Sequence, residues 1–139
     1  MLLCLAALVS FLFIAQAQTE EQGWKKTITL PSGEVVCDLN GEWDSLWTGR
    51  GEMLPLGSMR DVVKITQQGN SFEGIRMIGN MISSKGSLAL KGELDKDGFK
   101  NLHYYAKGEH IGSYKGKISK DGNLIEFNYK DGYLEFTRK

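Results

Sequence analysis

The sequence predicts an all-β fold, an antiparallel up-and-down barrel of about eight strands, with a small β-sandwich as the alternative. From Gly41 onward, short runs of β-branched and aromatic residues alternate with turn residues. No segment keeps the apolar period of about 3.6 residues that marks an amphipathic helix. The tripeptide Lys-Asp-Gly recurs at 96–98, 120–122 and 130–132. Asp-Gly between alternating apolar residues is a strong hairpin signal, so the strands are expected to pair with their chain neighbours.

The first 17 residues predict a signal peptide. Leu2 to Ala15 is almost unbroken apolar sequence, and Ala15-Gln16-Ala17 offers the small residues that signal peptidase requires before a cut at Gln18. The apolar stretch is shorter than the roughly 20 residues that span a bilayer, so no stable membrane insertion is expected. We therefore expect export, to the periplasm or to the extracellular space.

Residues 18–36 predict an N-terminal extension that precedes a barrel domain at 37–139. Within the extension, Thr27–Leu30 and residues 34–36 flank the turn Pro31-Ser32-Gly33 and suit an extra hairpin that plugs or skirts the closed end of the barrel. Loss of the leader removes Cys4 and leaves Cys37 as the one thiol of the mature chain. A buried, apolar role is favoured for Cys37, with a dimer bridge or a reactive thiol as alternatives.

Eight short runs with alternating character are the expected strands of the barrel. They are Gly41–Trp47, Arg60–Gln67, Ser71–Ile78, Ser87–Leu94, Lys100–Lys107, Gly112–Ser119, Asn123–Lys130 and Tyr133–Arg138. Two-residue turns at 131–132 and 121–122 and a three-residue loop at 97–99 fix three registers. The expected pairs are Tyr129 with Leu134, Phe127 with Phe136, Ile118 with Ile125, Tyr114 with Tyr129, and Leu94 with Leu102.

Glycine recurs inside three of these strands in the frame apolar-x-Gly, at Gly74, Gly92 and Gly116. Glycine within a strand marks a tight bend or a place where a neighbouring aromatic ring lies against the backbone. Bending glycines and evenly spaced strands with one apolar face favour a closed barrel over a flat sheet.

The two ends of the predicted barrel resemble the calycins, the group that contains the lipocalins and the avidins. Gly41-Glu42-Trp43 opens the first strand with Gly-x-Trp, and Arg138 ends the last strand. In calycins an arginine on the last strand packs over that tryptophan, so the resemblance implies structural roles for Gly41, Trp43 and Arg138. It implies an up-and-down barrel over about residues 37–139, without pointing to one family.

The chain also departs from both calycin groups. Avidin-like biotin sites are lined by tryptophans from later strands, yet no tryptophan follows Trp47. Ser45 falls near a biotin-contacting position, but Arg76 and Ile78 stand where Tyr and Thr-type ligands are expected. Biotin binding is therefore not expected. Compared with lipocalins, the chain is short and has no recognisable helix after its last strand.

Charge and residue usage exclude several functions. Seventeen Lys and Arg balance 17 Asp and Glu, so no net charge recruits nucleic acid. Two histidines and one mature cysteine form no metal-ligand spacing, and no cofactor motif is present. An enzyme is the least favoured class, because its best candidates are the adjacent Glu109 and His110, and adjacent side chains rarely converge on one substrate atom.

A ligand site is expected where the long connections meet at one end of the barrel. In an up-and-down barrel, segments 48–59 and 79–86 share an end with 108–112 and 131–132, and the first two are rich in apolar residues. The alternative is that these side chains fold down and plug the barrel, which is just wide enough for one small ligand or for packed side chains. The expected ligand-binding residues are Trp47, Met53, Leu54, Leu56, Met81 and Ile82, with Tyr104, Tyr114 and Tyr129 on the inner wall.

Arg76 is the sharpest single candidate for ligand binding. Alternation from Phe72 and Gly74 directs it inward, where a guanidinium suits an acidic head group. A bulge near Gly74 would instead turn Ile75 and Met77 inward and Arg76 outward. Both orientations are open from the sequence.

These patterns predict an exported, non-enzymatic barrel, a monomer or weak dimer, that binds a small apolar or amphipathic molecule at its open end. The alternative is a filled barrel that binds a protein partner through loop 48–59, as an inhibitor or an assembly factor.

Overall fold

A computed structural model describes residues 23–139, so the predicted signal peptide and its cleavage site lie outside the described residues. The described chain is all-β and antiparallel, as the sequence predicts. It has one short 3₁₀ helix, η1, at Gly51–Leu56. The strands are β1 (Thr27–Thr29), β2 (Val35–Cys37), β3 (Gly41–Gly49), β4 (Ser58–Gln68), β5 (Ser71–Arg76), β6 (Leu88–Asp95), β7 (Gly98–Ala106), β8 (Glu109–Ser113), β9 (Lys117–Ile118), β10 (Leu124–Tyr129) and β11 (Gly132–Arg138).

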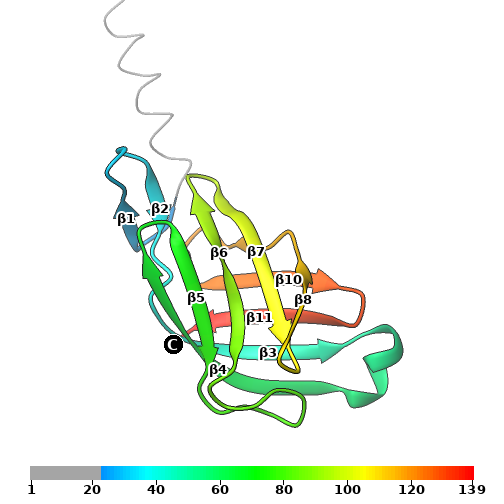
Figure 1. Cartoon of the computed structure of the whole chain (residues 1–139). Coiled ribbons are helices and arrows are strands. Elements are labelled where there is room, and N and C mark those ends of the chain that lie inside the picture. Colours follow the sequence, from blue (N-terminus) through cyan, green and yellow to red (C-terminus); the bar gives the residue numbers. More distant parts are fainter. Residues whose placement is uncertain (1–22) are drawn as a thin grey trace, which may run out of the picture.

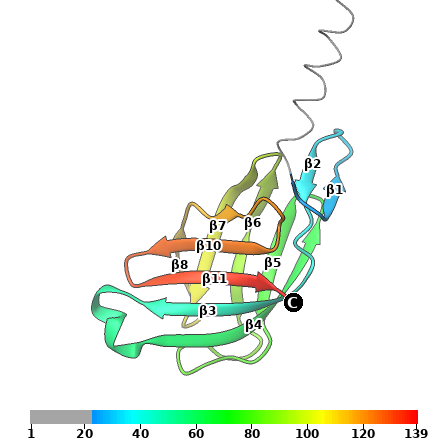
Figure 2. The ribbon, with the colours of Figure 1, turned by 180° about the vertical axis from the view of Figure 1, so that it is seen from behind.

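Within residues 23–139, nine of these strands form one sheet in the order β8-β7-β6-β5-β4-β3-β11-β10-β9, and β1 pairs with β2 separately. The two edge strands, β8 and β9, follow each other in the chain, so the edges of the sheet must come together. The sheet therefore curls into a barrel-like form, in which β3, β10 and β11 cross behind β5, β6 and β7 (Figures 1 and 2). This arrangement agrees with the predicted barrel.

The sixth predicted strand, Gly112–Ser119, is divided into β8 and β9. The first part pairs with β7 and the second part with β10, so the chain changes partner at residues 114–116. Gly116 lies at this change, where an added Cβ would come within 2.5 Å of Leu102 and 2.9 Å of Phe99. The missing side chain lets this segment cross tightly over β7.

Three predicted registers can be compared with the sheet. Ile118 pairs with Ile125 as expected. The expected pairing of Tyr129 with Leu134 is wrong by two residues, because the turn is at Lys130-Asp131 and Tyr129 pairs with Gly132. The expected three-residue loop at 97–99 is also wrong. The turn is at 96–97, and a bulge after Glu93 brings Leu94 opposite Phe99 rather than Leu102.

The hairpin of β1 and β2 covers one end of the barrel, the closed end, which also carries the connections 69–70, 96–97 and 119–123 (Figure 1). Val36, Cys37 and Leu39 are fully buried there. Burial raises the pKa of the Cys37 thiol from 9.0 to about 11. These features match the buried, apolar role favoured for this residue.

Arg138 and Trp43 also meet near the closed end. The guanidinium carbon of Arg138 lies 4.4 Å from the centre of the fully buried Trp43 ring. Arg138 also donates to the carbonyl oxygens of Asp38 and Gly122 at 2.8 and 2.9 Å. The side chain thereby joins the last strand to two segments of the closed end.

Within the part of the chain that the structure describes, no helix has both the length and the apolar character needed to cross a membrane.

Candidate functional site

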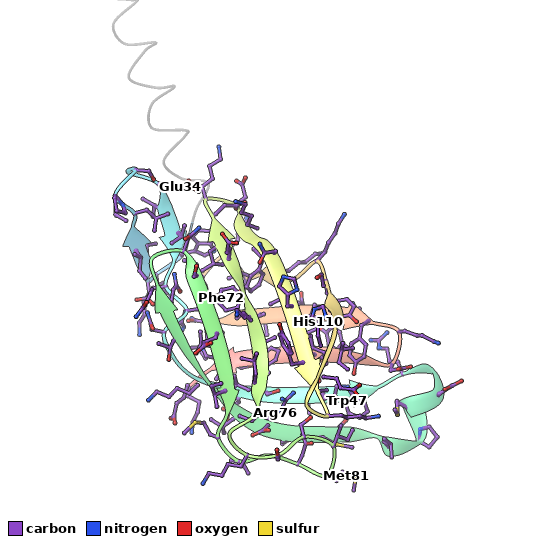
Figure 3. All side chains as sticks on the ribbon, in the orientation of Figure 1. Glu34, Trp47, Phe72, Arg76, Met81 and His110 are labelled. Carbon is purple, nitrogen blue, oxygen red and sulfur yellow. The ribbon has the colours of Figure 1, made fainter. Side chains whose placement is uncertain are left out.

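The opposite end of the barrel, the open end, contains a cavity of about 80 Å³. The connections 50–57, 77–87, 107–108 and 130–131 surround this end. Figure 3 shows Trp47, Arg76 and Met81 towards it, whereas Glu34 lies at the closed end. The cavity is lined by side chains from eight strands and by residues of all four connections, among them Met53, Asn80, Ile82, Ser83, Lys107 and Asp131.

One wall of the cavity is aromatic. The indole Nε1 of Trp47 donates to the hydroxyl of Tyr129 at 2.8 Å, and the ring centres of Tyr129 and Tyr104 lie 5.4 Å apart. Burial raises the pKa of both tyrosines, so their phenols resist ionisation more than those of exposed tyrosines. Trp47 lies directly against Gly132, where any side chain would collide with the indole.

Arg76 has the inward orientation of the two that the sequence left open. The register of β5 against β6 does shift between Gly74 and Ile75, yet the Arg76 side chain remains buried. Its Nη1 donates to the carbonyl oxygen of Leu88 at 2.7 Å, and its Nη2 donates to that of Tyr105 at 2.6 Å. Both terminal nitrogens are therefore already bound to the protein, which disfavours the expected role of Arg76 as the receptor of an acidic ligand.

Asp61 is the buried carboxylate beside Arg76, and the sequence analysis missed it. Its Oδ2 lies 3.9 Å from the Nε of Arg76, and the two side chains are 4% and 6% exposed. Its Oδ1 accepts hydrogen bonds from the backbone N–H groups of Val62, Ile78 and Gly79 at 2.7 to 3.2 Å. Its Oδ2 is buried without a hydrogen-bond partner among the described residues.

A signal for Asp61 was present in the sequence. Asp61 alternates in step with Val63, Ile65 and Gln67, and all four are buried on the inner face of β4. A carboxylate on the apolar face of a strand is costly to bury unless it is paired. Because of that cost, Asp61 is a candidate for a functional site.

The rim of the cavity is held by hydrogen bonds to its loops. Asp61 fixes the start of the 77–87 connection through Ile78 and Gly79. The hydroxyl of Ser83 accepts a bond from the backbone N–H of Lys107 at 3.1 Å, which joins this connection to the β7–β8 turn. The opening is therefore formed by loops that are tied to each other and to the barrel wall.

The structure brings together six of the predicted ligand-binding residues and leaves four outside. The cavity wall contains Trp47, Met53, Arg76, Ile82, Tyr104 and Tyr129. Leu54, Leu56 and Met81 are exposed on the outside, because η1 and the tip of the 77–87 connection present them to solvent. Tyr114 stacks on Phe127 with ring centres 5.7 Å apart and does not line the cavity.

The candidate acid–base pair Glu109 and His110 lies outside the cavity. Both residues are exposed on β8, and the Nε2 of His110 is 3.1 Å from the Nδ1 of His103 on β7. Among the described residues, no group of three or more His, Cys, Asp or Glu side chains is arranged to hold a metal ion.

Comparison with family models, with curated proteins and with solved structures finds no match to this chain.

Proposed function

We propose that this chain is an exported, non-enzymatic barrel that binds a small apolar or amphipathic molecule in the cavity at its open end. The observation that carries the proposal is the cavity of about 80 Å³, with its apolar wall and a few buried polar groups. Small-molecule sites in proteins have this composition. The packing of Arg138 over Trp43 gives further support, because it is the contact implied by the resemblance to calycins.

Mass spectrometry of the mature chain tests this function. The protein is purified from an exporting host without refolding, and its native mass is compared with its denatured mass. Additional mass that is lost on denaturation is the expected result, and its composition identifies the class of ligand. Because a host can lack the ligand, the same protein is also screened for thermal stabilisation by small amphipathic molecules. A bare mass together with no stabilisation would contradict the proposal.

Two variants show whether a retained molecule occupies the cavity. Ala106 is buried in the cavity wall, so Ala106→Leu should fill part of the space and remove the additional mass. Thr66→Leu introduces the same side chain on the exposed face of β4 and should retain it. Retention by both variants would place the molecule elsewhere on the protein.

A protein-binding role through loop 48–59 is the second candidate, because η1 exposes two large apolar side chains. Leu54 is 67% exposed and Leu56 is 44% exposed. Exposed apolar clusters often mark protein contact sites. A pull-down with the mature chain should then lose its partner with the double variant Leu54→Glu/Leu56→Glu and keep it with Ala106→Leu. The opposite pattern would exclude this loop as the contact.

A further inference from the structure

We propose that the cavity selects a neutral molecule that brings a hydrogen-bond donor, a hydroxyl or an amide N–H, to the Oδ2 of Asp61. This inference rests on the proposed small-molecule function and specifies the polar end of the ligand. Asp61 lines the cavity with a side chain that is 4% exposed, and its Oδ2 is buried without a hydrogen-bond partner among residues 23–139. A buried acceptor without a partner costs about 1 to 3 kcal/mol, more when it is charged, so a ligand that supplies a donor there recovers this cost.

The orientation of the Asp61 carboxylate is fixed by the protein. Three backbone N–H groups, from Val62, Ile78 and Gly79, donate to Oδ1. These bonds prevent the carboxylate from turning its satisfied oxygen towards the cavity. The Oδ2 atom is therefore a preorganised acceptor, and its position is set by β4 and by the start of the 77–87 connection.

An acidic ligand does not fit this arrangement. Three of the five N–H groups of Arg76 already donate to protein acceptors, namely Ser87 Oγ and the carbonyl oxygens of Leu88 and Tyr105, and its charge is balanced by Asp61. A second carboxylate in the cavity would face the Asp61 oxygen, and like charges in a buried site repel each other strongly.

A cationic ligand is also disfavoured. The Nε of Arg76 lies 3.9 Å from Asp61 Oδ2, so the charge of the carboxylate is already balanced. An ammonium group at the same oxygen would add a net positive charge to a buried site and lie close to the guanidinium. A neutral donor satisfies the oxygen without either cost.

A series of four-carbon probes with different functional groups tests whether the cavity prefers a neutral hydrogen-bond donor. The probes are butan-1-ol as a neutral donor, butan-2-one as a neutral acceptor, butyrate as an acid and butylammonium as a cation. Binding is followed by NMR through the indole N–H of Trp47, which lines the cavity. The indole N–H of Trp43, bonded to Leu39 at the closed end, is the internal control.

Butan-1-ol is expected to shift the Trp47 signal at concentrations at least about tenfold lower than the other three probes, since one hydrogen bond to a charged group is worth this factor or more. The Trp43 signal should stay in place. Equal binding of all four probes, or preference for the acid, the ketone or the cation, would overturn the selection and leave the binding cavity intact. No shift of Trp47 by any probe would overturn both the selection and the proposed function.

Asp61→Asn extends the test by exchanging the acceptor for a donor. The same three backbone N–H groups should hold the amide oxygen, which places the amide N–H₂ towards the cavity. We expect this variant to lose the preference for butan-1-ol over butan-2-one by at least about tenfold. An unchanged preference in the folded variant would overturn the role of Oδ2. If the variant does not fold, the wild-type series alone decides the question.

Discussion

Strand β4 carries two buried polar residues on the same face, Gln67 towards the closed end and Asp61 towards the open end, and each residue is 7% exposed when backbone and side chain are taken together. Both the nitrogen and the oxygen of the Gln67 side-chain amide form hydrogen bonds within the fold. Its amide nitrogen donates to the carbonyl oxygens of Cys37 and Gly69, and its amide oxygen accepts from the backbone N–H of Leu39. These bonds tie the N-terminal hairpin to the end of the barrel.

Among the described residues, only one of the two carboxylate oxygens of Asp61 accepts hydrogen bonds. One of its oxygens holds the loop at the rim, and the other, beside the Arg76 guanidinium, accepts no hydrogen bond from the described residues. Equal burial therefore does not imply an equal role. What separates a polar group that closes the fold from one that is available to a ligand is whether its hydrogen-bonding capacity is completed by the chain itself.

The largest effect is expected at the open end, from Arg76→Met. Removing the guanidinium leaves the Asp61 carboxylate buried beside the cavity without its counter-charge, which should lower the free energy of unfolding by about 3 to 5 kcal/mol. Urea denaturation measures this change. Arg60→Met, on the exposed face of the neighbouring strand β4, is the matched control and should change stability by less than about 0.5 kcal/mol.

The double variant Arg76→Met/Asp61→Asn distinguishes the buried charge from lost side-chain packing as the cause of the instability. Because it removes the uncompensated charge, it should be more stable than Arg76→Met alone by at least about 1 kcal/mol. If the double variant is no more stable than Arg76→Met alone, the loss arises from packing of the long side chain rather than from the buried charge.

At the closed end, Gln67→Leu is expected to have a smaller effect, about 2 to 3 kcal/mol. The substitution leaves a backbone N–H and two carbonyl groups without their partner, but it leaves no buried charge. Gln68→Leu, the same change on the exposed neighbour, should be close to neutral. Since Gln67 lies away from the cavity, the response of Trp47 to butan-1-ol should persist in Gln67→Leu. Loss of that response would show that the two ends are coupled.

Gly132→Ala should have an effect of about 1 to 3 kcal/mol, and it acts at the cavity wall. The added methyl group would collide with the indole of Trp47 and lie 2.9 Å from the Cε1 of Tyr129, so the Trp47–Tyr129 hydrogen bond should break. Tryptophan fluorescence and urea denaturation measure both consequences. Gly57→Ala at the same end meets only backbone strain, about 1 to 3 kcal/mol at φ 68° and ψ −122°, and should leave the fluorescence unchanged.

Gly132 also shows why the sequence predicted the strands better than their registers. Three Lys-Asp-Gly sequences predicted three turns, and Gly122 does lie in one with φ of +81°. Gly132 instead begins β11, where it is required because Trp47 packs against its backbone. Contacts between residues distant in sequence decide which role a glycine has, and a local pattern does not contain them.

The sequence likewise predicted only part of the candidate site. Alternation correctly directed Leu102 and Tyr104 to the inner face, because the two-residue period is a local property of a strand. The exposure of Leu54, Leu56 and Met81 was not predictable, since it depends on how η1 and the 77–87 connection lie over the rim. The pairing of Asp61 with Arg76 was not predictable from local alternation, because the two residues stand on different strands, although both occupy inward positions.

The smallest effect concerns Cys37 and appears only at alkaline pH. Burial raises its pKa from 9.0 to about 11, so between these pH values the unfolded chain loses a proton that the folded chain keeps. The unfolded state is thereby favoured, and stability should fall as the pH rises from about 9 to about 11. Tyr104 and Tyr129 act in the same direction, because burial raises their pKa values too.

Cys37→Ala retains both tyrosines, so urea denaturation at pH 8 and pH 10 should show a smaller loss of stability in this variant than in the wild type. An equal loss in both proteins would mean that the thiol ionises as readily in the folded barrel as in the unfolded chain, and that the hairpin of β1 and β2 does not seal the closed end.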